Sequence, residues 1–418
     1  MKIRAITIGQ NLFKSDPKLT SLRNNLKKLQ ILKNDFNNHG IEVEYIRFAS
    51  QTFSKTTDIT NFSIFERREE ILPILEGFTK ENLLGIYAYT PGLCDQVESL
   101  TPMQCKIMKN IPDLIYKYPN MFTSIQAGSN HGGLSFEAIK ESTKIIQRLS
   151  KPDPFQNVKF AVTFNVPPNT PFFPSAYHIG KSPTISIALE AADEVITVLK
   201  KNPLTTTNLT NVKKAIQLKF TKIFDQINDI AEAFCKKYEF LFKGIDLSPA
   251  PYPTKEKSIG TALEQLGLSK FGEPGTVFSV GFLTEALQSI DRPKIGFSGF
   301  MQPLLEDYTI ARRNNETKID ISKLLLYSTM CGLGLDCIPI PGNLDPAAIQ
   351  LLLMDLGMIS LRLKKPLTAR LMPITDRKAG EMTEFDFEYF INSKICDLPI
   401  PNSHDLNVFF KNNPSYLF

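Results

Sequence analysis

The sequence predicts an α/β protein in which parallel strands are common. Short apolar runs with the character of strands alternate with segments whose apolar residues recur every three or four positions, as on one face of a helix. Such strand–helix alternation is typical of α/β folds. It extends over most of the 418 residues, and neither a Gly- or Ser-rich linker nor a short repeat interrupts it. We therefore expect one large domain.

The first half of the chain opens with a mostly apolar strand at residues 3–8. Leu22, Leu26 and Leu29 begin a helical stripe, and Gly40 ends that helix. Pro73 is expected to kink or shorten the helix that contains it. The other elements expected in this half are strands at residues 41–46, 83–89, 122–126 and 160–164 and helices at residues 65–75, 102–116 and 135–149.

The second half continues the alternation. A strand that begins at residue 185 leads into a helix, and residues 210–240 form the longest expected helix, with an apolar stripe opposite its lysines. Asp345 is placed to cap the helix that follows it. The other elements expected here are helices at residues 258–267, 277–290, 322–331 and 346–361 and strands at residues 245–249, 294–297, 335–340 and 367–374.

The composition argues against several functional classes. Lys and Arg total 48 against 43 for Asp and Glu, an excess too small and too dispersed for a nucleic-acid-binding surface. No secretory signal opens the chain, and no apolar run approaches the roughly 18 residues of a membrane span. The 6 cysteines show no CxxC spacing, which argues for free thiols in a reducing compartment. We expect a cytoplasmic protein without nucleic-acid or membrane partners.

Residues 160–180 form the stretch that most resembles a ligand site. An apolar strand ends at Asn165, and a proline-rich loop follows that ends at His178. His178 suits proton transfer because histidine titrates near neutral pH, but a loop histidine can also serve only to satisfy backbone groups. Asn165 can donate to an oxyanion or stabilise the turn that it begins. His131 is a second candidate, because two glycines after it allow a ligand close to the backbone; a plain turn explains them equally well.

Two aspartates lie inside apolar strand runs. Asp246 and Asp336 must there be paired, hydrogen-bonded, metal-bound or protonated. Perturbed pKa values of this origin are typical of functional sites, and the alternative is a structural carboxylate that caps a neighbouring loop. Ser248 follows Asp246 by two positions and would share a strand face with it. No Gly-x-Ser-x-Gly elbow surrounds Ser248, which argues against a nucleophilic serine.

Other polar residues accompany strands and glycine-rich loops. Arg370 lies in an apolar strand, where an arginine either pairs with a buried carboxylate or holds an anionic substrate. Thr276 follows one glycine-rich loop and is placed to cap a helix whose free N–H groups can hold an anion, and Ser298 lies in a second such loop. Glu306 and Asp307 can bind a cation, but we expect them to be solvated. Without a Walker-type or dinucleotide motif, the sequence names no cofactor, and it indicates no metal site.

Several stretches resemble one known family. They are GIDLSPAP at residues 244–251, GFSGF and PLLED within residues 296–307, CGLGLDCIPIPG at residues 331–342, and KKPLTARLMP and KAGEMTEF within residues 364–385, with weaker counterparts in KIRAITIG at residues 2–9 and SIQAGSNHGGLSFEAIKE at residues 124–141. On these motifs the chain resembles the prokaryotic domain-of-unknown-function family seven hundred and eleven, also called uncharacterised protein family zero two one zero. The most specific part is the run at residues 366–385.

The resemblance implies a closed α/β barrel like that of pyruvate formate-lyase, with strands inside and helices outside. This barrel would comprise residues 1–390, and residues 391–418 would form a C-terminal surface tail. The resemblance implies no known reaction. Glycyl-radical chemistry is not expected, because no Arg-Val-x-Gly-Tyr stretch lies near the C-terminus. The family and the size of the chain favour a homodimer.

These observations favour an enzyme that acts on a small anionic metabolite by acid–base chemistry in a pocket at the barrel centre. His178 and either Asp246 or Asp336 would share the proton transfers, and Arg370 would hold the anion. The other residues expected to bind the substrate are Asn165, Ser248, Thr276, Ser298 and His131. The alternative is a non-catalytic barrel that binds a metabolite or a protein partner, in which these polar residues form a structural network.

Overall fold

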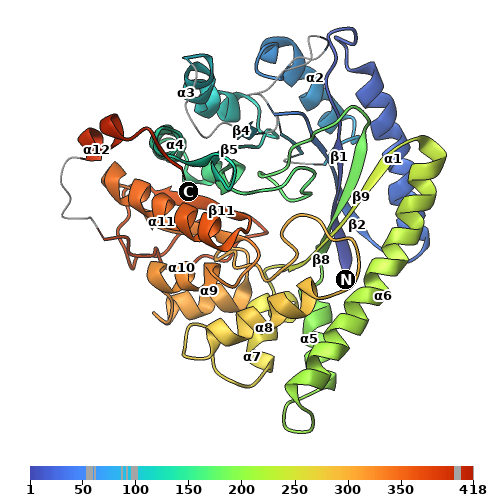
Figure 1. Ribbon diagram of the computed structural model, residues 1–418, viewed down its shortest axis with the longest axis vertical. Coiled ribbons are helices and arrows are strands. Elements are labelled where there is room, and N and C mark those ends of the chain that lie inside the picture. The colour runs from blue at the N-terminus through green and yellow to red at the C-terminus, as the bar shows by residue number, and fades with distance from the viewer. Residues whose placement is uncertain are drawn as a thin grey trace.

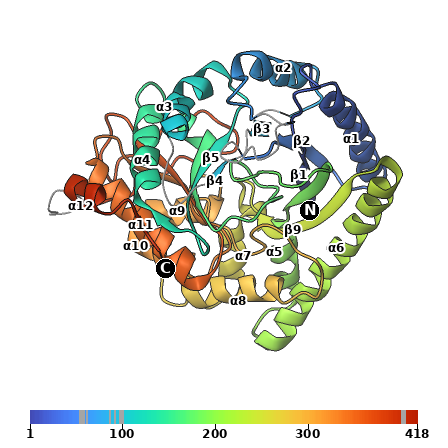
Figure 2. The ribbon, with the colours of Figure 1, turned by 45° about the horizontal axis from the view of Figure 1, so that its top comes forward.

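The chain forms two sheets enclosed by helices in a computed structural model that describes residues 1–52, 60, 63–85, 88–90, 93–95, 102–399 and 406–417 (Figure 1). In the view of Figure 2 the helices form a ring around the strands. The described helices are α1 (Thr20–Asn38), α2 (Arg68–Lys80), α3 (Pro102–Lys117), α4 (Phe136–Ser150), α5 (Ala192–Lys201), α6 (Leu209–Tyr238), α7 (Ile259–Gln265), α8 (Thr276–Gln288), α9 (Tyr308–Asn315), α10 (Ile321–Ser328), α11 (Pro346–Leu363) and α12 (Leu406–Asn412). The predicted α/β class is confirmed.

The first sheet has the strand order β3–β2–β1–β8–β9. Its strands are β1 (Lys2–Gly9), β2 (Val43–Ala49), β3 (Tyr89–Thr90), β8 (Thr184–Glu190) and β9 (Leu241–Ala250). Neighbouring strands are parallel except at the seam between β1 and β8, where they are antiparallel. Nearly every residue of β1 and β8 is buried, as expected of strands covered on both faces.

The second sheet has the order β10–β11–β7–β5–β6–β12, and β4 pairs with β5 beside this path. Its strands are β4 (Leu93–Asp95), β5 (Thr123–Ser129), β6 (Gly133–Ser135), β7 (Phe160–Phe164), β10 (Gly334–Pro341), β11 (Leu367–Ile374) and β12 (Ser415–Tyr416). Here too the long strands are parallel within each half, β10 with β11 and β5 with β7, and an antiparallel seam joins β11 to β7.

Isolated bridges link the edges of the two sheets. On one side Tyr89 of β3 pairs with Met121, just before β5, and the Phe122 N–H donates to the Tyr89 carbonyl at 2.8 Å. On the other side Ile245 of β9 pairs with Lys294, and Asp336 of β10 pairs with a residue of the same connecting segment, Pro303. The segment 294–303 therefore runs from the edge of one sheet to the edge of the other.

The helices form where the sequence places apolar stripes and caps. In α1 the stripe of Leu22, Leu26 and Leu29 is fully buried against the first sheet, as its spacing predicts. Asp345 caps α11 by accepting the Ala347 N–H at 2.8 Å, which confirms that assignment. Pro73 lies inside α2 and does not end it.

Two expected strands differ in the structure, and one helix was not expected. The strand expected at residues 83–89 is reduced to Tyr89–Thr90 among the described residues, and residues 86–87 lie outside them. The strand expected at residues 294–297 is only the bridge at Lys294, because Gly296 and Ser298 take positive φ angles of 65° and 41° and turn the chain. Helix α9 was not expected from periodicity, since only its N-cap signals it.

That N-cap is Asp307. Its carboxylate accepts N–H groups of Thr309 and Ile310 in α9 and of Ile259 in α7, together with the Ser258 hydroxyl at 2.7 Å. Asp307 is fully buried, so the expectation that it is solvated is wrong. One carboxylate thus holds the N-termini of two helices, which is favourable because both present unsatisfied N–H groups.

Among the described helices, α11 is long and apolar enough to cross a membrane by length and composition alone. Half of it is buried inside the structure, where it packs on α4 and β11. Core helices of soluble proteins have the same properties, so the expectation of no membrane partner stays a prediction.

The C-terminal segment returns to the second sheet. Ser415 and Tyr416 of β12 pair with β6. Gly133 of β6 has a φ of 76°, and a Cβ there would lie 2.1 Å from the Tyr416 carbonyl oxygen. The second glycine after His131 therefore lets the backbone of β12 approach.

Candidate functional site

Residues from both sheets line a cavity of about 110 Å³. β1 and β2 contribute Arg4, Tyr45 and Arg47, whereas β10 and β11 contribute Asp336 and Arg370. Tyr45 and Arg47 are two positions apart on one strand, so their side chains face the same side. The cavity therefore brings together charged residues that are more than 300 positions apart in the sequence.

Asp336 and Glu306 share one guanidinium group. Arg370 binds both oxygens of Asp336 in a fork, through Nε and through Nη2 at 2.9 Å, and Nη2 also donates to Glu306 Oε1 at 2.9 Å. The Cys337 thiol donates to the same oxygen at 3.2 Å. The expectation that Glu306 is solvated is wrong, because this half-buried carboxylate faces Arg370 in the cavity. Of the two roles considered for Arg370, pairing with a buried carboxylate or holding an anionic substrate, the structure shows the first.

Burial acts against both negative charges. It raises the pKa of Asp336 above its ordinary value in spite of Arg370. Burial also opposes ionisation of Glu306, but the charges of Arg370 and Arg4 outweigh it and hold the pKa of Glu306 below its ordinary value. Two carboxyl groups beside one guanidinium titrate as a pair, and the first proton is taken up more readily than by an isolated carboxylate.

On the side of the cavity formed by β1 and β2, the positive charges of Arg4 and Lys2 are balanced by carboxylates. Arg4 pairs with Glu190 at 3.3 Å and Glu44 at 3.6 Å, and it donates to the Pro251 carbonyl at 2.7 Å. Lys2 lies 3.3 Å from Glu44 and 3.5 Å from Glu190. The Tyr389 hydroxyl donates to Glu44. Two cations therefore face two carboxylates.

Arg47 has no such counter-ion. The side chain is half-buried, and its Nε atom is buried without a hydrogen-bond partner. Within the described ranges no carboxylate forms an ion pair with it; its guanidinium instead lies over the rings of Phe173, at 5.1 Å, and Tyr45, at 5.5 Å. Burial, followed by the positive charge of Arg4, lowers the pKa of Arg47 to about 10. The cavity therefore contains a half-buried positive charge that has no carboxylate partner among the described residues and whose Nε–H donor is unused.

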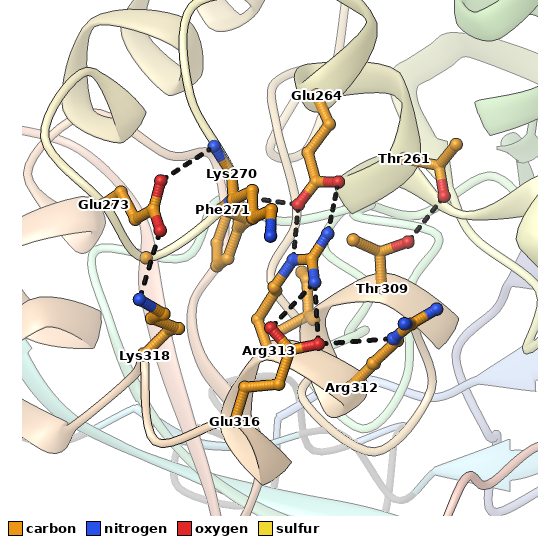
Figure 3. Close-up of polar contacts among 12 residues, drawn as sticks. Thr261, Glu264, Lys270, Phe271, Glu273, Thr309, Arg312, Arg313, Glu316 and Lys318 are labelled. Atoms are coloured by element: carbon orange, nitrogen blue, oxygen red, sulfur yellow. Dashed lines mark hydrogen bonds and ion pairs between the residues drawn. The ribbon is translucent and has the colours of Figure 1, made fainter.

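Arg313 of α9 pairs with Glu264 of α7 and shows what a structural arginine looks like in this protein (Figure 3). It binds both oxygens of Glu264, at 2.7 and 2.8 Å, and both oxygens of Glu316, at 2.8 Å each. Arg47 makes none of these contacts although it is held in a fixed strand. The difference marks Arg47 as a site for an anion that the protein itself does not supply.

The rest of the cavity wall is largely apolar. Phe172 and Phe173 belong to the proline-rich loop after β7, and Phe173 packs edge-on against Phe122 with 5.6 Å between ring centroids. Phe297 and Met301 come from the segment that joins the two sheets. The stretch at residues 160–180 thus reaches the site through its phenylalanines.

His178 lies outside the set of residues that line the cavity. It is fully buried, with its ring nitrogens near the Thr184 hydroxyl, at 3.3 Å, and the Gly180 carbonyl, at 3.2 Å. Burial lowers the pKa of His178 to about 4, so the ring is neutral at pH 7. The catalytic role assigned to His178 stays a prediction.

Asp246, Ser248 and Ser298 are brought together beside the cavity. Asp246 accepts the N–H groups of Ser248, Phe297 and Ser298 at 2.8–2.9 Å. The Ser248 hydroxyl accepts the Gly299 N–H at 3.1 Å, and Ser298 Oγ accepts the Leu247 N–H at 3.1 Å. This cluster holds the turn that presents Phe297 to the cavity. Burial raises the pKa of Asp246, and these hydrogen bonds oppose that rise.

The other three predicted binding residues lie apart from the cavity wall. Asn165 takes a positive φ of 54° and joins the end of β7 to the neighbouring turn by accepting the Asn130 N–H at 2.7 Å. His131 is exposed. Thr276 is buried at the start of α8, where its hydroxyl accepts the Gly272 N–H at 3.0 Å and donates to the Glu273 carbonyl at 2.8 Å. Their roles in ligand binding stay predictions.

Sequence reasoning singled out Asp336 and Arg370 but missed Arg4 and Arg47. The usable signal was the same in each case, a charged residue within a strand of apolar neighbours. In the segment VEYIRFA the two charges, Glu44 and Arg47, are three positions apart and lie on opposite faces of the strand, so the pattern does not show that one of them lines a cavity. Among the described residues, no group of three or more His, Cys, Asp or Glu side chains is placed to hold a metal ion.

Fold and site together define a mixed α/β protein with a cavity walled by arginine, carboxylate and phenylalanine side chains between two sheets. The sequence pattern of the uncharacterised family DUF711 matches residues 1–392, and the chain belongs to this family. Curated relatives are named UPF0210 proteins. One from Pyrobaculum arsenaticum is 29% identical over 264 residues, covering 62% of this chain and 58% of the relative. One from Thermoanaerobacter sp. is 25% identical over 417 residues, covering 92% of this chain and 88% of the relative.

A third relative, from Oenococcus oeni, is 27% identical over 293 residues, with 68% of this chain and 65% of the relative covered. The chain thus spans less than two thirds of the length of the Pyrobaculum and Oenococcus relatives in these matches. The family description and the names of the relatives state no reaction, substrate or cofactor.

Proposed function

We propose that this protein is an enzyme that binds a small anionic metabolite in the cavity and acts on it by acid–base chemistry. The observation that carries the proposal is the unpaired guanidinium of Arg47. A charged group that is partly removed from water and has no counter-ion is costly, and an anion that accepts its hydrogen bonds offsets that cost. An arginine also presents a planar fork that fits a carboxylate or phosphate group.

The carboxyl pair at the opposite wall can move a proton. Asp336 and Glu306 lie on one guanidinium, and burial raises the pKa of Asp336. A protonated Asp336 can donate to a bound substrate, and the ionised partner can accept a proton from it. Arg370 holds both side chains in place and keeps its charge, because Asp336 and Glu306 raise its pKa in spite of burial.

Radical chemistry is not part of the proposal. The cysteine in this region, Cys337, does not line the cavity, and its thiol donates to Glu306. Burial raises the pKa of Cys337 well above its ordinary value, so the thiol stays protonated.

We further propose that the two sheets are the halves of a closed barrel like that of pyruvate formate-lyase, with this cavity at its centre. The bridges at Tyr89, Lys294 and Pro303 support this arrangement, since they join the sheet edges on both sides. The ring of helices around the strands in Figure 2 also supports it.

The test combines ligand binding with two arginine variants. Wild-type protein is screened by thermal shift against small carboxylates and inorganic phosphate, with Arg47→Met as the site variant. Arg312→Met is the matched control, because Arg312 is an exposed arginine outside the cavity. We expect an anion that raises the Tm of wild type and of the control but not of Arg47→Met. An anion that stabilises all three proteins equally would contradict the proposed site.

A non-catalytic binding protein is the second candidate. The observation that favours it is the saturation of Arg370 by its two carboxylates, which a purely structural network would also show. Asp336→Asn separates the two candidates: an enzyme loses turnover of the ligand while retaining binding, whereas a binding protein shows no turnover in either form.

A further inference from the structure

We infer that the ligand is a monocarboxylate with an apolar body, of about ten non-hydrogen atoms in all. This inference rests on the proposed function and adds the chemical class of the ligand. It follows from the charge balance around the cavity, the size of the cavity and the composition of its wall.

The charge balance admits one negative charge. Five cations and four carboxylates gather at the cavity and behind its wall, an excess of one positive charge: Lys2, Arg4, Arg47, Lys257 and Arg370 against Glu44, Glu190, Glu306 and Asp336. Every member except Arg47 has a partner of opposite charge within 4.0 Å among the described residues. A ligand charge therefore has one open position, at Arg47.

A second ligand charge would be unfavourable. The cavity extends from Arg47 to the wall formed by Glu306 and Asp336. A dianion that reached across would place its second charge against those carboxylates, because the Arg370 donors already bind them. Like charges at short range in a buried site repel strongly. This argues against dicarboxylates and phosphate esters.

The size of the cavity limits the ligand. The volume of about 110 Å³ accommodates on the order of ten water-sized atoms, at roughly 10–15 Å³ for each. Nucleotides and other large cofactors exceed this volume.

The wall defines the remainder of the ligand. Beyond the charged residues the wall has a few hydroxyl groups, those of Ser175, Thr368 and two tyrosines, but is formed mainly by side chains that offer no hydrogen bonds. The largest of these are Phe122, Phe172, Phe173, Phe297, Met301 and Leu333. Such a surface favours an apolar group over the hydroxyl-rich body of a sugar or a polyol. Since four of these six side chains are rings, an aromatic body fits the wall well.

The test is isothermal titration calorimetry with 4-methylbenzoate, succinate, inorganic phosphate and the neutral 4-methylbenzyl alcohol. We expect 4-methylbenzoate to bind wild type and Arg312→Met equally, and Arg47→Met and Arg47→Gln about 10- to 100-fold more weakly, as for loss of a charge-assisted hydrogen bond. Succinate, phosphate and the alcohol should bind wild type at least about 10-fold more weakly than 4-methylbenzoate. Urea unfolding checks that both Arg47 variants are folded.

Other outcomes distinguish an error in the ligand class from an error in the proposed anion site. If succinate or phosphate binds more tightly than 4-methylbenzoate and depends on Arg47, the ligand class is wrong and the proposed anion site survives. If 4-methylbenzyl alcohol binds as tightly as 4-methylbenzoate, the ligand does not need a negative charge and the inferred class of monocarboxylates is wrong. If no anion binds in an Arg47-dependent way, both the inference and the proposed function fail.

Discussion

Replacing Arg47 with methionine should stabilise the ligand-free protein. Mainly through burial, the pKa of Arg47 falls from the ordinary value of a guanidinium group to about 10 in the folded state. At 1.36 kcal/mol per pKa unit this corresponds to a cost of about 3 kcal/mol for keeping the charge. The side chain is only half-buried, so water in the cavity reduces the cost, and we expect a gain of about 1–2 kcal/mol. Because the folded pKa is lowered, this cost is present at every pH well below 10.

Arg370→Met is the matched comparison and should have the opposite sign. Its loss leaves Asp336 and Glu306 buried without a counter-ion, which costs about 3–5 kcal/mol. We thus expect opposite changes in the free energy of unfolding for two arginines that line one cavity. Arg47 has no carboxylate partner to lose, whereas the loss of Arg370 leaves two carboxylates without a counter-ion.

The assay is urea unfolding of ligand-free protein at pH 7, followed by circular dichroism. For a chain of this length thermal denaturation is less sensitive, since 1–2 kcal/mol shifts Tm by only about 1–2 °C. If Arg47→Met destabilises the protein by as much as Arg370→Met, Arg47 must have a structural partner, and the reasoning that makes it a ligand site is refuted.

Three further predictions concern titration and positioning. Anion binding should cause the Asp336–Glu306 pair to take up a proton, because a negative charge nearby raises the pKa of both carboxyl groups. Calorimetry in buffers of different ionisation enthalpy measures this proton uptake, which should vanish in Asp336→Asn. The pKa of His178 is about 4 in the folded protein and 6.5 in the unfolded chain, so the unfolded chain takes up a proton first as the pH falls. The free energy of unfolding should therefore fall by about 3 kcal/mol between pH 6.5 and pH 4. His178→Gln should remove that part of the pH dependence in urea unfolding, and an unchanged pH dependence would contradict a buried neutral ring. Asp246→Ala leaves three buried N–H groups without an acceptor and should cost about 3 kcal/mol, with hydrogen exchange rising at residues 297–298; unaltered exchange there would show that Asp246 does not hold the turn.

Much of the fold follows from local patterns in the sequence. The stripe from Leu22 and the cap at Asp345 depend on residues a few positions apart, and both features are found as predicted. The segment at residues 294–297 was misassigned because a distant residue, Asp246, captures its N–H groups and replaces a strand neighbour. Asp307 was misjudged for a similar reason, since its partners in α7 lie nearly fifty residues away.

The cavity was only partly predictable. Asp336 and Arg370 were identified because both lie in apolar strands, but their pairing depends on the parallel register of β10 and β11. Arg47 was not identified, because the sequence of β2 alone does not show what its two faces contact, and only its position beside β1 places Arg47 at the cavity. The neighbouring strands decide whether a charged residue in a strand contacts water. The sequence of that strand alone does not show which strands will lie beside it.

The most direct test of the central claim is a crystal structure of the protein with 4-bromobenzoate, in which anomalous scattering locates the bromine. We predict one bromine peak among Phe122, Phe173 and Phe297, with the carboxylate within hydrogen-bonding distance of the Arg47 guanidinium. An empty cavity at a ligand concentration that saturates binding in solution, or a ligand bound there with its carboxylate away from Arg47, would contradict the claim.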